Sequence, residues 1–214
     1  MKVKWLGHSA FLITANDGTK IITDPYSDYA GIKYKPIDET ADIVLASHKH
    51  GDHFGGKVKG NPGTVVDAGS KVIKGIQIKG IATYHDTSKG RERGSNIVFC
   101  FTVDGLKLCH LGDLGHDLSD TEIAEIGPVD ILMIPVGGLY TIDSNVAGKI
   151  CDKIKPGVVM PMHYKTGKLE FPISGVEGFL KGKTGVKKLA ASEVEFQPGK
   201  LPGAKEIIVL QHAL

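Results

Sequence analysis

The sequence has little of what marks a secreted or membrane-spanning protein. It contains only 3 cysteines, Cys100, Cys109 and Cys151, and none of them forms a CxxC pair. Because all three also lie in apolar strand or helix patterns, we interpret them as buried thiols in a reducing compartment. No apolar run approaches the ~20 residues that a membrane-spanning helix needs. We therefore expect no membrane insertion.

An excess of either charge is also absent. The 26 Lys and Arg residues nearly balance the 24 Asp and Glu residues, which leaves a net charge of +2. Such a balance argues against nucleic acid as the main partner. The first residues enter a strand-like pattern with no apolar signal region, so we expect a cytoplasmic protein. With no repeat, low-complexity segment or linker, residues 1–214 are expected to form a single domain.

The most informative segment is SHKHGDH at residues 47–53, which places three histidines and an aspartate within six positions. His48 and His50 alternate as they would along an extended chain, so both rings can project to the same side. Asp52 and His53 follow where the chain turns away, and can address a second point nearby. Imidazole and carboxylate together suit zinc, or iron, manganese or nickel. We interpret the segment as a metal site rather than a solvated histidine-rich loop.

The residues before this motif support that interpretation. Residues 42–46 form a short apolar run with β-branched side chains, which is typical of a buried strand. The candidate ligands therefore begin at the carboxyl end of a strand, where α/β proteins usually place their chemistry.

An HxHxDH motif after a hydrophobic strand resembles the signature of the metallo-β-lactamase superfamily. That superfamily takes three further ligands from separate strand ends, and candidates occur in the same order here, at His85, Asp113 and His163. The segments WLGHSA at residues 5–10 and TDP at residues 23–25 narrow the resemblance. They are similar to a branch that contains ascorbate-6-phosphate lactonase-like proteins and many uncharacterised metal-dependent hydrolases. The resemblance specifies fold and metal, but not the substrate.

The resemblance implies two divalent metal ions, with Zn²⁺ as the first choice and Mn²⁺, Fe²⁺ or Ni²⁺ as alternatives. The first ion would be held by His48, His50 and His85. The second ion would be held by Asp52, His53 and His163. Asp113 would bridge the two ions, and the catalytic carboxylates would be Asp52 and Asp113. Water between two such ions, ~3.5–4 Å apart, loses a proton far more easily than bulk water. The implied reaction is hydrolysis by a metal-bridging hydroxide.

Turn and capping signals are consistent with this fold. Asp-Gly pairs at residues 17–18 and 104–105 lie between apolar runs and predict two β-hairpins. Ser119 and Glu122 form a capping box that predicts one helix, and Asp143 is placed to cap another. Together with the resemblance, these signals predict an α/β fold, a four-layer αββα sandwich of two mixed β-sheets flanked by helices. The metals would lie in the groove where the sheets meet.

Four further polar residues lie outside the predicted ligand set and need an interpretation of their own. His8 either orients a ligand or reaches the substrate, or it is a hydrogen-bonded turn residue. We expect Asp24 to lie beside the site and support a ligand. His116 is a rival for the neighbourhood of Asp113, as a supporting or substrate-contacting group. His110 lies within a strand, and we interpret it as structural.

The substrate is less well indicated. Arg91 and Arg93 follow His85 in a polar loop, where they either grip a phosphate or carboxylate or are simply solvated. Our leading hypothesis is a binuclear metal hydrolase that acts on a small, anionic ester, lactone or phosphodiester. A non-catalytic metal-binding or interaction module of the same fold is the alternative. An iron-dependent oxidoreductase ranks lower, since those members depend on a flavin domain for which the chain leaves no room. A homo-oligomer is common in this branch.

Overall fold

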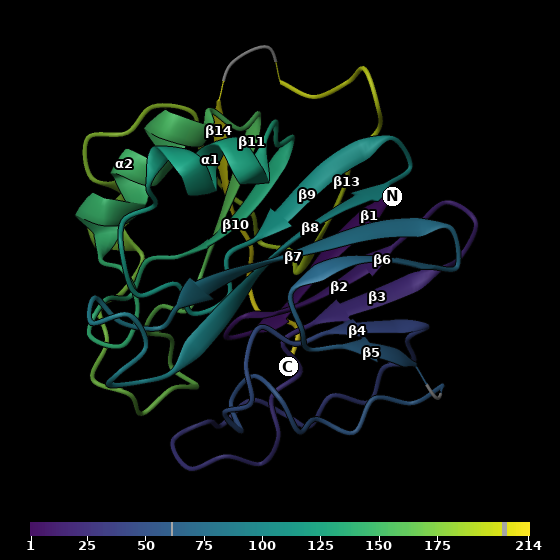
Figure 1. The fold of residues 1–214 in the computed structure, drawn as a ribbon, viewed down its shortest axis with the longest axis horizontal. Helices are drawn as coiled ribbons and strands as arrows, with labels where there is room; N and C mark the ends of the chain where they lie inside the picture. The colour runs from purple at the N-terminus through teal and green to yellow at the C-terminus, as the bar shows by residue number, and fades with distance from the viewer. Residues whose placement is uncertain (61, 203–204) are drawn as a thin grey trace.

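The strands form two mixed β-sheets, in a computed structural model that describes residues 1–60, 62–202 and 205–214 (Figure 1). The six-stranded sheet has the order β13 (Glu193–Glu195), β1 (Lys2–Gly7), β2 (Ala10–Thr14), β3 (Lys20–Thr23), β4 (Ile43–Leu45) and β5 (Gly63–Val65). The eight-stranded sheet has the order β12 (Val186–Lys188), β14 (Glu206–Val209), β11 (Val158–Met162), β10 (Ile131–Pro135), β9 (Leu106–His110), β8 (Ser95–Val103), β7 (Ile76–Tyr84) and β6 (Gly69–Ile73). Each sheet has a parallel and an antiparallel part, as predicted.

Both predicted hairpins and both predicted helix starts are present. Strands β2 and β3 pair antiparallel, as do β8 and β9. At the second turn Asp104 and Gly105 both have positive φ, 51° and 79°, the combination that a tight hairpin turn requires. Helix α1 (Asp120–Ile126) begins with the complete capping box at Ser119. Helix α2 (Ser144–Ile154) begins with the Asp143 carboxylate accepting two backbone N–H groups.

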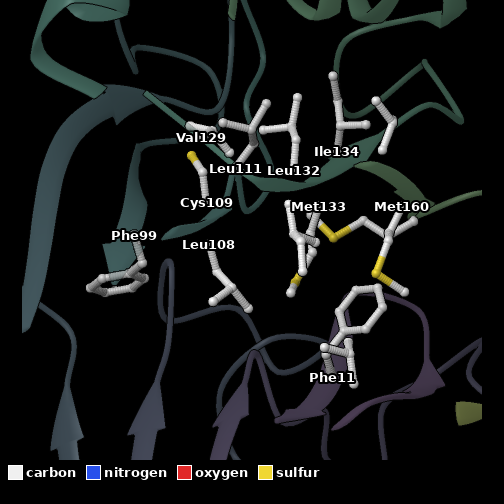
Figure 2. Packing of buried hydrophobic residues seen from close by; sticks show 14 of the residues in the cluster. Phe11, Phe99, Leu108, Cys109, Leu111, Val129, Leu132, Met133, Ile134 and Met160 are labelled. Carbon is white, nitrogen blue, oxygen red and sulfur yellow. The ribbon is translucent and has the colours of Figure 1, made fainter. Parts of the chain in front are cut away.

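The main hydrophobic core fills the space between the two sheets and continues, with Leu132 and Ile134, on the opposite face of the eight-stranded sheet (Figure 2). Side chains alternate along β2, so that Phe11 and Ile13 point into this core and Leu12 points outward. Figure 2 shows Phe11 facing the methionines of β10 and β11 across the interior, Met133 and Met160. Burying a side chain of this size stabilises the fold by roughly 1.5–3 kcal/mol. The core therefore fixes how the edges of the two sheets meet.

The outer layers of the two sheets differ. Helices α1 and α2 connect parallel strands of the eight-stranded sheet, and α3 (Glu177–Leu180) lies near α2. The outer face of the six-stranded sheet carries a second apolar cluster, in which Leu12 and Ile22 pack against Tyr34 and Leu169 from loops. In the described part of the chain this outer layer has no helix. Pro25 and Pro36 within the covering segment disfavour one.

Several strands end at the same edge of the sandwich. The segments that follow β1, β4, β7, β9 and β11 carry the polar residues that the sequence analysis singled out. Because β9, β10 and β11 are parallel, their carboxyl ends meet at one edge, as expected for an α/β site. Among the described residues, no helix combines the length and apolarity needed to cross a membrane.

Candidate metal centre

All seven predicted metal ligands come together at this edge. Possible ligand atoms of His48, His50 and His85 all lie within 4.8 Å of one another, and we call these residues the first cluster. Possible ligand atoms of four other residues also lie within 4.8 Å of one another, and we call these residues the second cluster: His8, Asp52, His53 and His163. The clusters match the two predicted ligand sets, with His8 as the one addition.

Asp113 lies between the two clusters. Its Oδ2 is 3.3 Å from His85 Nε2 of the first cluster. The same oxygen is 3.1 Å from His53 Nε2 and 3.3 Å from His163 Nε2 of the second cluster. A carboxylate in contact with both groups is in the position that the resemblance gives to a bridging ligand.

Several buried polar atoms of the centre lack a hydrogen-bond partner. Among the described residues, eight buried side-chain nitrogen and oxygen atoms have no hydrogen-bond partner, and all but the Ser9 hydroxyl belong to the centre. They are both ring nitrogens of His8, His48 Nε2, His53 Nε2, His85 Nδ1, Asp113 Oδ1 and His163 Nδ1. A buried polar atom without a partner is costly, because it has lost its hydration. Divalent cations would satisfy this set of imidazoles and carboxylates, so the residues present fit metal ions.

The protonation of the buried histidines supports the same fit. Burial, with the neighbouring His53, lowers the pKa of His48 to about 3. Burial, with the neighbouring His163, lowers the pKa of His8 to about 4. Both rings are therefore neutral near pH 7, and a neutral imidazole keeps the lone pair that binds a metal.

His53 and Asp113 behave differently, as a coupled pair. Burial disfavours the charged form of His53, but the carboxylates of Asp113 and Asp24 raise its pKa well above the ordinary value. Burial likewise disfavours ionised Asp113, but His163 and His53 hold its pKa well below the ordinary value. The centre therefore already concentrates carboxylate charge, and a cation would take the place of the proton on His53.

Asp24 and Ser47 orient one histidine in each cluster. The Asp24 carboxylate accepts hydrogen bonds from His53 Nδ1 at 2.8 Å, from the Ser47 hydroxyl at 2.8 Å and from the Ser47 N–H at 2.7 Å. The Ser47 hydroxyl also lies 3.0 Å from His48 Nδ1. Each ring therefore has its Nδ1 engaged and its Nε2 left for a ligand role. The structure places Asp24 beside the centre, in contact with His53 and Ser47, whereas the sequence analysis did not give Ser47 a role.

Asn96 fixes the backbone that carries Asp113, and the sequence analysis did not find it. The Asn96 side chain accepts from the Asp113 N–H at 2.9 Å and donates to the Leu111 carbonyl at 3.0 Å. Between them, Gly112 has φ +57°, and a Cβ there would lie 2.4 Å from both Asn96 Oδ1 and Ser47 Cβ. Only glycine fits this close approach. An asparagine within a strand carries no sequence signal for such a role.

Two other histidines lie outside both clusters. His110 is fully buried, with Nε2 at 2.9 Å from the Ser9 carbonyl and Nδ1 accepting from the Gly112 N–H, which fits the structural interpretation. His116 Nε2 accepts from the Tyr84 N–H, and its Nδ1 lies 2.8 Å from the Asp117 carbonyl. The structure therefore does not bring His116 to the centre, because the local backbone occupies both of its nitrogens.

A pocket of about 260 Å³ opens above the centre. Its floor consists of His50, Asp52, His85, Asp113 and His163. Its walls consist of Tyr29, Arg93, Tyr140 and Phe171. The Arg93 guanidinium stacks over the Tyr140 ring at 5.7 Å. Of the two predicted arginines, the structure places only Arg93 in the pocket, while Arg91 donates to the Ser88 carbonyl. The aromatic walls have no motif in the sequence.

Asp86 holds the loop that carries Arg93. Its carboxylate accepts four backbone N–H groups at 2.7 to 3.0 Å, those of Ser88, Gly90, Glu92 and Arg93. Burial opposes ionisation of Asp86, but these bonds lower its pKa to about 2. The residue directly after His85 thus shapes one wall of the pocket. An aspartate that accepts from the N–H two residues later is a common turn signal, and could have been noticed.

The two-sheet fold and the histidine–aspartate centre resemble those of metallo-β-lactamase-like proteins, and comparison with known proteins agrees. The β-lactamase superfamily domain matches residues 2–163 of this chain. The chain belongs to the metallo-β-lactamase superfamily.

Particular relatives narrow the comparison further. A "UPF0173 metal-dependent hydrolase" of Carboxydothermus hydrogenoformans is 34% identical over 194 residues, which cover 78% of this chain and 85% of the relative. One from Pyrococcus abyssi is 31% identical and covers 94% of this chain and 98% of the relative. A Thermotoga maritima crystal structure, provisionally described as a Zn-dependent hydrolase of the superfamily, superposes with a TM-score of 0.82 at 36% identity. It covers 98% of this chain and 97% of that one.

Proposed function

We propose that the protein is a binuclear metal-dependent hydrolase that acts on a small anionic ester, lactone or phosphodiester. The observation that carries this proposal is the position of the centre, whose unpartnered ligand atoms lie beneath a pocket walled by Arg93. The names of the relatives, which describe metal-dependent hydrolases, support the reaction class. They do not name a substrate.

The two clusters would hold one ion each, and Asp113 would contact both. Three imidazoles and one carboxylate oxygen suit tetrahedral Zn²⁺ at the first cluster. When bound, a pair of divalent ions lowers the pKa of water and polarises a carbonyl or phosphoryl oxygen. Asp52 and Asp113 both line the pocket, so we assign them the catalytic role.

The pocket walls indicate the kind of substrate. Its volume of about 260 Å³ is slightly below the ~300–1,000 Å³ of ordinary ligand pockets, which favours a small molecule. Arg93 supplies a planar fork of donors that suits a carboxylate or phosphate group. Tyr29, Tyr140 and Phe171 would cover the apolar part of the substrate and limit access of water to it.

The experiment that tests this function begins with metal content. The protein is purified without chelator, its metal is measured per chain, and the measurement is repeated after loading with Zn²⁺ or Mn²⁺. Two ions per chain, followed by metal-dependent hydrolysis in a screen of lactones and phosphodiesters, is the expected result. One ion per chain would contradict the binuclear assignment. No bound metal under any loading would refute the hydrolase.

A further inference from the structure

His8 differs from His110, the other buried histidine outside the predicted ligand set. The side chain of His8 is fully buried, and neither ring nitrogen has a hydrogen-bond partner. His110 is just as buried, but a protein group engages each of its nitrogens. A structural histidine is expected to resemble His110, because an unsatisfied buried nitrogen is costly. The environment of His8 therefore does not fit a packing role.

The ring of His8 faces the second cluster. Its Nε2 is 3.5 Å from Asp52 Oδ2, and its ring centroid is 4.2 Å from that of His163 and 5.0 Å from that of His53. Ligand atoms of all four residues lie within 4.8 Å of one another. One ion could therefore be in reach of His8 and of the three predicted ligands together.

The backbone holds His8 in this place at a conformational cost. His8 and His163 both have left-handed backbone, with φ of 52° and 49°. They are joined through a hydrogen bond from the His163 N–H to the His8 carbonyl at 3.2 Å, and the Trp5 indole donates to the same carbonyl at 3.0 Å. Non-glycine residues rarely adopt this conformation, and such strain gathers at functional sites. Both strained residues present their rings to the same cluster.

We propose that His8 is a direct ligand of the second metal ion, beside Asp52, His53, His163 and the bridging Asp113. The second ion would then have three nitrogen and two carboxylate ligands, one more than the first ion. Five protein ligands suit an ion that takes five or six partners, whereas the first cluster suits a tetrahedral one. The two sites of one centre therefore differ in metal preference. This inference rests on the proposed function, since it needs a second ion.

The test compares wild type with two variants loaded with Co²⁺, an ion whose visible spectrum reports its coordination. His8→Phe keeps the ring volume without a nitrogen, and His8→Asn suits the left-handed backbone. His116→Ala is the matched control, because it removes a histidine outside the centre. We expect both His8 variants to bind the first ion as wild type does. They should bind the second ion roughly 10- to 100-fold more weakly, and the Co²⁺ spectrum of that site should indicate a lower coordination number.

A crystal structure of the metal-loaded wild type gives a readout that needs no variant. A His8 nitrogen ~2.0–2.1 Å from the second ion, the usual length of a metal–imidazole bond, would support the assignment. If the wild type binds two ions but the His8 nitrogens lie beyond bonding distance, only this assignment is wrong. The same follows if both variants keep wild-type affinity and spectrum. A wild type that takes up a single ion would overturn this assignment and the binuclear function together.

Discussion

The two clusters of the centre use different architecture. The first cluster takes two of its three histidines from one loop, and His50 in it is exposed to solvent. The second cluster takes its four residues from the segments after β1, β4 and β11, and its three histidines are almost completely buried. The first cluster thus draws on two segments of the chain and includes an exposed histidine, whereas the second draws on three segments and its histidines are buried.

The difference in exposure suggests different roles for the two clusters. The exposed His50 can exchange water and meet the substrate. Residues of both clusters line the pocket, His50 and His85 from the first and Asp52 and His163 from the second. A buried cluster built on strained backbone instead depends on its surroundings to keep the rings in place. Variants that change one cluster and leave the other intact are therefore the most informative test of the centre. Because Asp113 contacts both clusters, its replacement should cause the largest loss of metal and activity.

The largest effect is expected from Asp113→Ala, because this variant removes a carboxylate that contacts both clusters. Its Oδ2 lies within 3.3 Å of a histidine in the first cluster and of two in the second. Metal ions supply several kcal/mol of transition-state stabilisation, and each ~1.4 kcal/mol is tenfold in rate. We expect metal content to fall and hydrolysis to drop by a factor on the order of 10³. Elemental analysis and kinetics on the same sample check this, and two retained ions with full activity would show that Asp113 is no bridge.

A smaller and more selective effect is expected from Asp24→Asn. The amide cannot accept all the hydrogen bonds that the carboxylate takes from His53 and Ser47. Loss of a carboxylate that orients a metal-binding histidine typically weakens binding ~10–100-fold. We expect this loss at the second ion, measured by competition with a chelator.

Ser47→Ala is the matched control for that variant. It removes the hydroxyl that lies 3.0 Å from His48 Nδ1 and leaves the bond between Asp24 and His53 in place. We expect the affinity for the first ion to fall by about tenfold, at the lower end of such effects, while the second ion binds as in wild type. If Ser47→Ala weakened the second ion as much as Asp24→Asn does, the clusters would not be separable.

The parts of the centre that the sequence could predict are those with a local pattern of residues. The first cluster was readable because a period of two along residues 48–50 places two ligands together. Asp113 and His163 were found by their order at strand ends, which the resemblance supplied. Contacts between distant segments create the surroundings of His8 and the hydrogen bond from the Asp113 N–H to the Asn96 side chain. No local pattern records such contacts.

The fold shows the same division. Hairpins and helix starts were predicted correctly, because turn and capping chemistry lies within a few residues. Strands β5, β6, β12 and β13 were not predicted. Their side chains are mostly exposed or half-buried, and they form by pairing with neighbouring strands rather than by burying an apolar face. The loop layer over the six-stranded sheet was likewise not predicted, because its tyrosines and prolines show no regular period.

Arg93→Ala examines the open side of the centre. The Arg93 side chain is 35% exposed and lines the pocket together with residues of both clusters. A hydrogen bond to a charged group contributes about 1.5–3 kcal/mol, and solvent exposure favours the low end, so KM for an anionic substrate should rise about tenfold. The value of kcat should be unchanged, because the lost contact is the same in ground and transition states. Arg93→Lys should restore part of the affinity, and an unchanged KM in both variants would remove Arg93 from the substrate site.

The smallest effect is expected from Asp86→Asn, which would change the pocket only indirectly, through the loop that carries Arg93. The amide has one acceptor oxygen in place of two, so only part of the loop's four N–H bonds would remain. Arg93 should then be less well positioned, with KM rising roughly two- to fivefold and metal content unchanged. In wild type the pKa of Asp86 is lowered to about 2, so its bonds stabilise the folded loop above the unfolded pKa of ~3.9 and are lost only as the pH falls toward 2. The ratio of KM between variant and wild type should therefore stay constant from about pH 5 to pH 9. A ratio that changed across this range, or a loss of metal, would mean that Asp86 acts on the first cluster itself.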